Sequence, residues 1–395
     1  MSYRIIYTGS SIGSIEALSS TLDCDPAHLL QIASDVASNY VPFQVPKKNG
    51  GVREIRAPKP TLKAIQKRIN SRIFSNCIFP TYLQGSIKDP TNTRDFVSNA
   101  AAHSKSKTVI SADIENFYPS VQFGIVKEVF KYLFRFSDDV SNTLAQLTTL
   151  DGVLPQGAPT SSYLANLVFY NNEPKLFEEF SRSGFVYTRL IDDITVSSTA
   201  LLDKQRKNWI IQKIAGLLAN KGLTMHRGKL RQEVTNSPGH QVVVTGLWID
   251  KGHPRLSTID RRNIRAAVYN SGKEYEAGHK TTKAYHDRYN SASGKVALMT
   301  RLGHAQATSF RETLVSILPE YDKRFGRKVE KLCWMFIGLR GAGRDKASYT
   351  KRYHKLMYHL AILGRSKPEK AAQLRRELRA FRPVFKVSEL AEESI

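Results

Sequence analysis

Ile191-Asp192-Asp193-Ile194 places two adjacent carboxylates inside an apolar stretch that runs from Gly184 to Val196. The pattern predicts two strands joined by a turn, with the acidic pair at the tip. Acidic side chains that are partly buried side by side repel each other, and a bound divalent cation would relieve this repulsion. The pair therefore indicates a metal site. The alternative is an ordinary type I′ hairpin turn, in which Asp is common.

A third acid ends an earlier apolar stretch. Residues 109–114, Val-Ile-Ser-Ala-Asp-Ile, predict a short buried strand with Asp113 at its carboxyl end. If this strand lies beside the Asp192-Asp193 hairpin, three carboxylates meet, which is the ligand set of two-metal chemistry on phosphates. The same ligands would suit nucleotidyl transfer or hydrolysis.

Between these acids lies the loop Leu154-Pro155-Gln156-Gly157-Ala158-Pro159-Thr160-Ser161, followed by an expected helix. Gly157 would allow a ligand to approach the main chain closely, and Gln156 could support a nucleotide or its template base. Taken alone the loop is unremarkable. Its place between Asp113 and the acidic pair makes the combination specific.

The composition fits a partner that carries phosphates. The 395 residues include 59 Lys and Arg against 35 Asp and Glu, a formal charge of +24. This excess suits binding along a nucleic-acid backbone, although ribosome or membrane-surface binding would also fit. Three widely spaced cysteines indicate neither a disulfide framework nor a zinc site. The start lacks a signal peptide and no apolar run could span a membrane, so we expect a cytoplasmic protein.

Together these motifs resemble the palm motifs of reverse transcriptases, and most closely those of bacterial retrons. Asn99-Ala100-Ala101-Ala102-His103 and Val244-Thr245-Gly246 carry the retron resemblance. It implies an α+β right-hand polymerase fold of fingers, palm and thumb, with an antiparallel palm sheet and a helical thumb and C-terminal extension. We expect the N-terminal helix and fingers, with part of the palm, in residues 1–108, the palm in 109–250, and the thumb and extension in 251–395.

The resemblance implies an RNA-directed DNA polymerase that copies its cognate structured noncoding RNA (msr-msd) into branched single-stranded DNA (msDNA). Priming would come from a guanosine 2′-hydroxyl, and the system would serve antiphage defence. Two Mg²⁺ ions, dNTPs, the RNA, the msDNA and a separately encoded effector protein are the implied cofactors and partners. The alternatives are a related defence reverse transcriptase with different or no priming, and a catalytically weak RNA-binding scaffold. One departure is Leu190-Ile191, where the family usually has Tyr-Ala before its acids.

The resemblance also assigns roles to single residues. Asp113, Asp192 and Asp193 would be catalytic, and together with Ile114 they would bind metal. The residues expected at the nucleotide are Lys47, Arg53, Tyr118, Gln156, Gly157 and Lys229. Those expected at the RNA are Asn99, His103, Val244, Thr245 and Gly246.

Several nucleotide-site roles have plainer alternatives. Lys47, next to Lys48 in a basic Asn-Gly-Gly hairpin, could belong to a solvated turn. Arg53 is the better phosphate candidate, because a guanidinium can grip phosphate with two N–H groups. Tyr118 would exclude a ribose 2′-hydroxyl as a steric gate or simply pack in the core. Lys229 could approach the triphosphate or lie on the surface.

The RNA-site roles are open in the same way. Asn99 and His103 lie at helical spacing, so they could bond each other, bind an RNA phosphate or make structural hydrogen bonds. Val244-Thr245-Gly246 could belong to a core strand. The C-terminal helices could dock RNA or a partner, and completion of a helical bundle is the plainer alternative.

Overall fold

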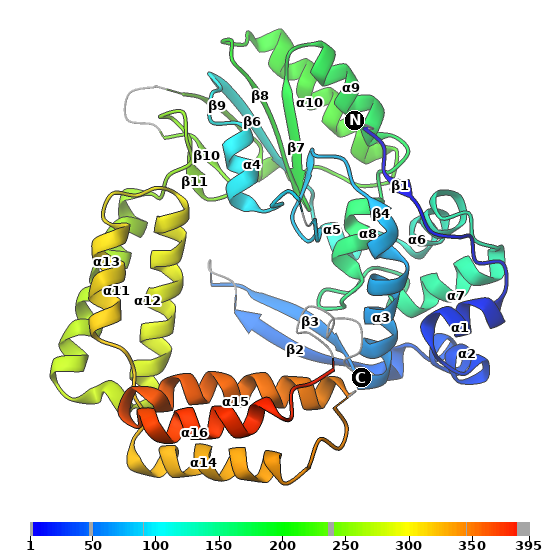
Figure 1. The fold of residues 1–395 in the computed structure, drawn as a ribbon. Helices are drawn as coiled ribbons and strands as arrows, with labels where there is room; N and C mark the ends of the chain where they lie inside the picture. Colours follow the sequence, from blue (N-terminus) through cyan, green and yellow to red (C-terminus); the bar gives the residue numbers. More distant parts are fainter. Residues whose placement is uncertain (1–2, 47–49, 90, 236–240, 345, 385–395) are drawn as a thin grey trace. The chain divides into compact units, whose positions relative to one another are not determined.

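The computed structural model describes residues 3–46, 50–89, 91–235, 241–344 and 346–384 (Figure 1). The chain forms two compact units, one within Met1–Pro254 and one within Arg255–Ser394. Their boundary lies close to residue 250, where we expected the palm to end. The first unit contains both the expected fingers and the expected palm, and the division at residue 108 stays a prediction.

A five-stranded sheet forms the centre of the first unit. Its order is β5-β7-β8-β6-β9, and each neighbouring pair is antiparallel except β5 with β7. Alternate residues of a strand point to opposite faces. Ile110 and Ala112 are buried in the core, whereas Ser111 and Asp113 lie half-buried on the other face. The strands are β5 (Leu83–Gln84), β6 (Thr108–Asp113), β7 (Val186–Leu190), β8 (Asp193–Ser198) and β9 (Arg231–Val234).

Helices cover the apolar face of this sheet, and Figure 1 shows α9 and α10 side by side along it. Amphipathic patterns place Phe180 of α9 and Ile214 of α10 in the core. The α2 helix begins at Pro26, because the Asp25 side chain accepts the His28 N–H and proline suits the first turn of a helix. The helices of this unit are α1 (Ile15–Leu22), α2 (Pro26–Ser34), α3 (Pro60–Arg72), α4 (Phe96–Ala102), α5 (Phe117–Ser120), α6 (Phe123–Glu128), α7 (Asp138–Thr148), α8 (Ser161–Leu167), α9 (Glu173–Arg182) and α10 (Lys204–Ala219).

Three two-stranded pairs complete the first unit. The expected fingers hairpin is present, with Phe43 opposite Ile55 and Val45 opposite Arg53. Lys47 and Lys48 lie outside the described residues. The stretch 241–250 forms a tight hairpin of two short strands instead of one core strand. The pairs are β2 (Tyr40–Pro46) with β3 (Val52–Pro58), β10 (Val243–Val244) with β11 (Leu247–Trp248), and β1 (Ile6–Tyr7) with β4 (Cys77–Ile78).

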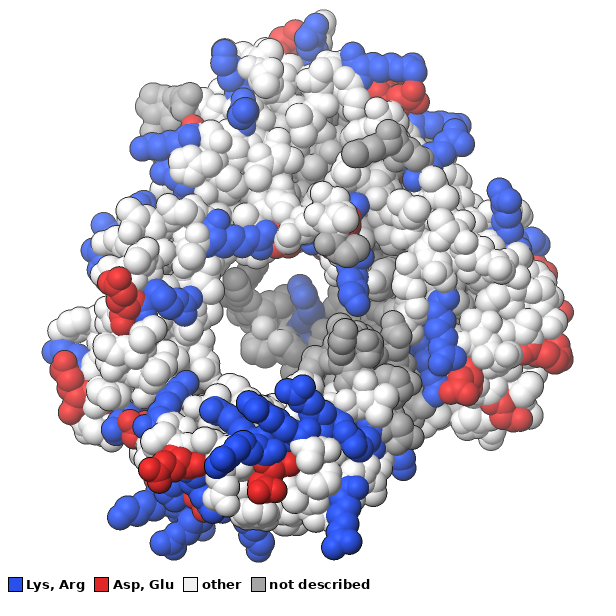
Figure 2. Space-filling model, viewed as in Figure 1, with Lys and Arg blue, Asp and Glu red and all other residues white. Residues whose placement is uncertain are grey.

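The second unit is helical throughout its described residues. Val329, Phe336, Tyr353 and Leu360 pack into one core with α16, so the C-terminal helices complete a bundle of their own. Figure 2 shows Lys and Arg gathered over α15 and α16. Within the described part of the chain, no helix combines the length and the apolarity needed to cross a membrane. The helices are α11 (Thr258–Glu276), α12 (Lys283–Arg301), α13 (Ala307–Ser316), α14 (Lys323–Ile337), α15 (Ala347–Ser366) and α16 (Pro368–Arg379).

Candidate active site

The structure brings the three predicted acids to the same end of the palm sheet. Asp113 pairs directly with Asp193 across β6 and β8. Residues directly opposite on neighbouring strands project from the same face, so these two side chains share the open face of the sheet. The Ile114 N–H donates a hydrogen bond of 3.0 Å to the Asp192 carbonyl, which fastens the hairpin tip to the end of β6.

The acidic hairpin has an unusual turn. Leu190 pairs with Asp193, so Ile191 and Asp192 alone form the loop. Ile191 has a φ of 59°, and Asp192 is not among the residues with positive φ. Positive φ at the first loop residue alone is the type II′ pattern, which favours Gly there, so the type I′ alternative is wrong. A side-chain-bearing residue in this region costs about 1–2 kcal/mol, and a β-branched one is an outlier.

Burial and mutual repulsion raise the pKa values of the two acids in the hairpin. Burial raises the pKa of Asp193 to about 6, and the charges of Asp192 and Asp113 add to the rise. Burial also raises the pKa of Asp192, with Asp113 as a further cause. The Lys229 ammonium donates to Asp113 at 2.9 Å, and this hydrogen bond raises the lysine's pKa. The cluster therefore favours a nearby positive charge.

The chemistry of these ligands fits a divalent cation. Carboxylate oxygens are the groups that Mg²⁺ prefers, and three of them lie at one end of the sheet. Across the residues that the structure describes, no group of three His, Cys, Asp or Glu side chains is already placed to hold a metal ion. Binding would therefore require these carboxylates to reorient. Ile114 has a buried apolar side chain, so only its main chain could contribute.

The predicted nucleotide residues approach this cluster from several elements. Arg53 of β3 lies near enough to lower the pKa values of Tyr118 and Asp192, while burial keeps both values raised overall. Tyr118 follows Asp113 on α5, and its hydroxyl lies 3.4 Å from the Ser162 hydroxyl. Lys229 lies just before β9, the strand that pairs with β6, and its ammonium donates to Asp113. Lys47 lies outside the described residues.

Gly157 has a different neighbour from the one we expected. Its φ is +116°, and a Cβ there would lie 2.6 Å from Ile55 Cγ2 and 3.0 Å from the Arg56 carbonyl oxygen. The Arg56 N–H also donates to the Gln156 carbonyl at 2.8 Å. The protein's own fingers hairpin thus makes a close approach to this loop, and nucleotide binding by Gln156 and Gly157 stays a prediction. Gln156 and Gly157 join fingers to palm.

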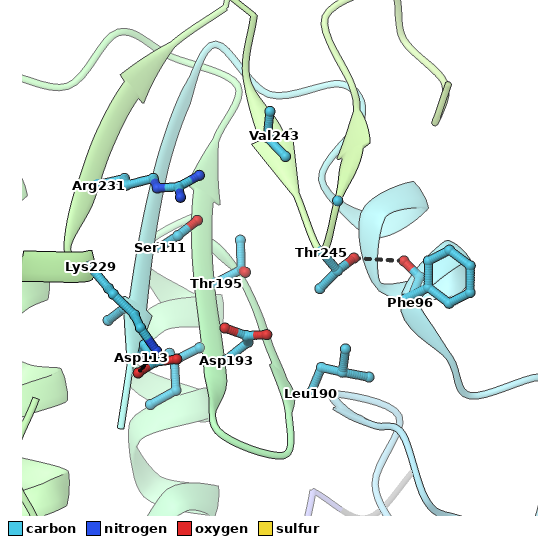
Figure 3. A pocket seen from close by; sticks show the side chains of 13 residues that line it. Phe96, Ser111, Asp113, Leu190, Asp193, Thr195, Lys229, Arg231, Val243 and Thr245 are labelled. Carbon is cyan, nitrogen blue, oxygen red and sulfur yellow. Dashed lines mark hydrogen bonds and ion pairs between the residues drawn. The ribbon is translucent and has the colours of Figure 1, made fainter. Parts of the chain in front are cut away.

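A pocket of about 310 Å³ opens beside Asp193 (Figure 3). The turn of the β10–β11 hairpin forms one wall, with φ of 47° at Thr245 and 83° at Gly246, the type I′ pattern. Thr245 Oγ1 donates to the Phe96 carbonyl at 2.8 Å. Val244 is buried, so its side chain packs in the core and does not reach RNA. Sequence reasoning missed other residues that line this pocket, among them Phe96, Ser111, Thr195 and Arg231.

Asn99 and His103 are both fully buried, so the expected contact of these side chains with RNA is wrong for this structure. His103 Nδ1 lies 2.7 Å from Ser197 Oγ, and Nε2 lies 2.7 Å from Thr188 Oγ1. The ring therefore links α4 to β7 and β8. The structural hydrogen-bond alternative holds for His103, although its partners are these hydroxyls and not Asn99.

The buried ring predicts acid sensitivity. Burial lowers the pKa of His103 to about 3, whereas an unfolded chain takes up this proton near pH 6.5. Because the unfolded state binds the proton first, stability is lost as the pH falls from about 6.5 toward 3. Between pH 7 and pH 5 we expect this group to lower the free energy of unfolding by about 2 kcal/mol. Urea unfolding of wild type and His103→Gln should show the flatter pH dependence in the variant, and equal slopes would contradict the prediction.

Comparisons with known proteins agree with this geometry. The family described as "Reverse transcriptase (RNA-dependent DNA polymerase)" matches residues 45–249. The Retron Se72 reverse transcriptase of Salmonella heidelberg is 38% identical over 95% of this chain and 98% of its own. The Retron Ec48 reverse transcriptase of Escherichia coli is 30% identical over 95% and 94%. A solved telomerase from Candida tropicalis aligns with a TM-score of 0.38 at 12% identity, over 56% of this chain and 55% of that one, too loosely to support an argument. The chain is thus a member of the retron reverse transcriptases, RNA-directed DNA polymerases with the right-hand fold.

Proposed function

We propose that this polymerase copies its own structured noncoding RNA into branched msDNA, starting from a guanosine 2′-hydroxyl, as part of an antiphage defence system. A separately encoded effector protein would act with it in the cytoplasm. The observation that carries the proposal is the similarity to retron reverse transcriptases along 95% of the chain, through both units. Structured RNA is recognised largely by shape and 2′-hydroxyls, which suits a basic protein with a formal charge of +24.

Within this proposal, Asp113, Asp192 and Asp193 would hold two Mg²⁺ ions. Such ions activate the attacking hydroxyl and neutralise the triphosphate. Arg53 would bind the incoming triphosphate, and Lys229, which donates to Asp113 in this structure, would be a second cation near the same phosphates. Leu190, Thr245 and Gly246 line the pocket beside Asp193, where the primer end would lie.

Tyr118 is proposed to select deoxyribonucleotides. Its ring is half-buried beside Ser162, so truncation would open space where a 2′-hydroxyl could fit. We expect Tyr118→Ala to reduce the preference for dNTPs over rNTPs by about 10- to 100-fold, the range of discrimination that a shaped pocket supplies. Single-nucleotide incorporation with each substrate measures it. Tyr132→Ala is the matched control, because that ring is 61% exposed and its loss should leave the preference unchanged.

The function is tested by isolating the protein from its native locus with its bound nucleic acid. Ribonuclease, deoxyribonuclease and a debranching enzyme then report the chemistry of the bound species. A branched RNA–DNA molecule that is absent from Asp192→Asn supports the proposal. Unbranched DNA would favour a defence reverse transcriptase with another priming mode, and RNA alone in both samples would favour the scaffold.

A further inference from the structure

A buried ion pair lies directly behind the acidic hairpin. Arg189 of β7 is 0% exposed and Glu173, at the start of α9, is 1% exposed. Arg189 Nε donates to Glu173 Oε1 at 2.7 Å, and Nη2 donates to Oε2 at 2.8 Å. The Tyr187 hydroxyl donates to the same carboxylate at 2.6 Å. A charged residue inside an apolar strand is the sequence signal that could have revealed this pair.

The rest of the guanidinium holds main-chain carbonyls. Nη1 donates to the Ile191 carbonyl at 3.0 Å and to the Ala165 carbonyl at 3.2 Å. Nη2 also donates to the Asn166 carbonyl at 3.1 Å. With the two bonds to Glu173, all five N–H donors of Arg189 are used. A lysine, with three donors and no planar fork, could not make this set.

One of these carbonyls belongs to the strained residue of the acidic hairpin. Ile191 has a φ of 59°, a conformation that a β-branched residue rarely adopts without support. Its peptide leads directly into Asp192. Asn166, which Arg189 also holds, donates its side-chain N–H to the Gly85 carbonyl at 3.1 Å. A Cβ at Gly85 would lie 2.6 Å from Leu190, so this second chain of contacts reaches the same turn.

We infer that Arg189, oriented by Glu173, is a positioning residue for polymerisation. It holds the Ile191 peptide in its left-handed conformation and so aims the Asp192 and Asp193 carboxylates at the metal. Arg189 itself touches neither substrate nor metal in this account. The inference rests on the proposed role of the acids and adds a residue pair to it.

Arg189→Lys tests the inference, with Arg68→Lys as the matched control. Arg68 of α3 is also buried and donates to the Leu22 and Asp23 carbonyls, away from the acidic hairpin. We expect Arg189→Lys to slow nucleotide addition about 100-fold, the cost of a small misplacement of reacting groups. Its Mn²⁺ affinity, titrated by electron paramagnetic resonance, should fall about tenfold, while template–primer affinity stays within threefold. Arg68→Lys should lose thermal stability only.

A second-site change separates positioning from simple core stability. Gly adopts positive φ without strain, so Ile191→Gly should lessen the need for the Arg189 hydrogen bond. We expect the double variant Arg189→Lys/Ile191→Gly to add nucleotides about tenfold faster than Arg189→Lys alone. The single variant Ile191→Gly is measured as well, to give the effect of the glycine when Arg189 is present. The inference would be overturned if the double variant added nucleotides no faster than Arg189→Lys, or if Arg68→Lys lost as much polymerase activity as Arg189→Lys. If Asp192→Asn kept DNA synthesis and Mn²⁺ binding, the proposed metal-binding role of the acids would be wrong. That result is distinct from a failure of the positioning role of Arg189.

Discussion

Asp192→Asn is expected to abolish DNA synthesis, lowering the rate by about 10³-fold or more, because the amide cannot supply the charge that binds a catalytic cation. The same change should not destabilise the protein. Burial and mutual repulsion raise the pKa values of Asp192 and Asp193, so these carboxylates disfavour the folded state at neutral pH. Removing the charge of Asp192 reduces the repulsion that acts on Asp113 and Asp193. Primer extension and thermal unfolding of the same preparation measure both effects.

The matched control for this prediction is Asp151→Asn. Asp151 is exposed and has a φ of 51°, a conformation that Asn tolerates well. We expect wild-type synthesis from this control and unchanged RNA affinity from both variants. A lowered melting temperature in Asp192→Asn would mean that the acids stabilise the fold and that lost synthesis reflects unfolding.

Gly157→Ala should separate the fingers hairpin from the palm loop. The added methyl would meet Ile55 and the Arg56 carbonyl, and the φ of +116° suits only Gly. Overpacking and backbone strain each cost about 1–3 kcal/mol, so we expect a loss of about 2–4 kcal/mol in the free energy of unfolding. The KM for dNTP should rise about tenfold or more, since Arg53 lies on the displaced hairpin.

Gly152→Ala is the control that separates the effect of backbone strain from the effect of the contact with the fingers hairpin. Gly152 also has positive φ, 78°, but nothing lies within 4 Å of a Cβ there. It should lose stability without a change in KM. Adding Ile55→Ala to Gly157→Ala removes the closest contact and should restore part of the dNTP affinity. If both glycine variants raise KM equally, the contact with the hairpin does not matter.

The sequence predicted the strands whose residues form a short, recognisable pattern. Two apolar stretches predicted β6 and the β7–β8 hairpin, and the acids lie at the ends of these strands. Register was beyond reach, because the pairing of Asp113 with Asp193 depends on two strands far apart in the chain. The turn type at Ile191 was missed because the residue itself argues against positive φ, and buried contacts hold it there.

Side-chain surroundings were the least predictable feature of the site. The four-residue spacing of Asn99 and His103 correctly places them on neighbouring turns, but the same spacing fits a surface or a core. Because α4 packs on β7, both side chains lie in the core. Likewise Gly157 correctly signalled a close main-chain approach, while the identity of the approaching group required the fold.

The order of strands in the palm sheet has a consequence for synthesis on the ribosome. Strand β6 lies between β8 and β9, and its partner for Thr108 on β9 is Val234. At translation rates of 5–20 residues per second, β9 would emerge roughly 6 to 25 s after β6. Throughout that interval the nascent chain carries the strand that ends in Asp113 without its complete set of neighbours. An unpaired strand edge invites association with other chains, so strand β6 is the part of this palm where we expect chaperones to be needed most.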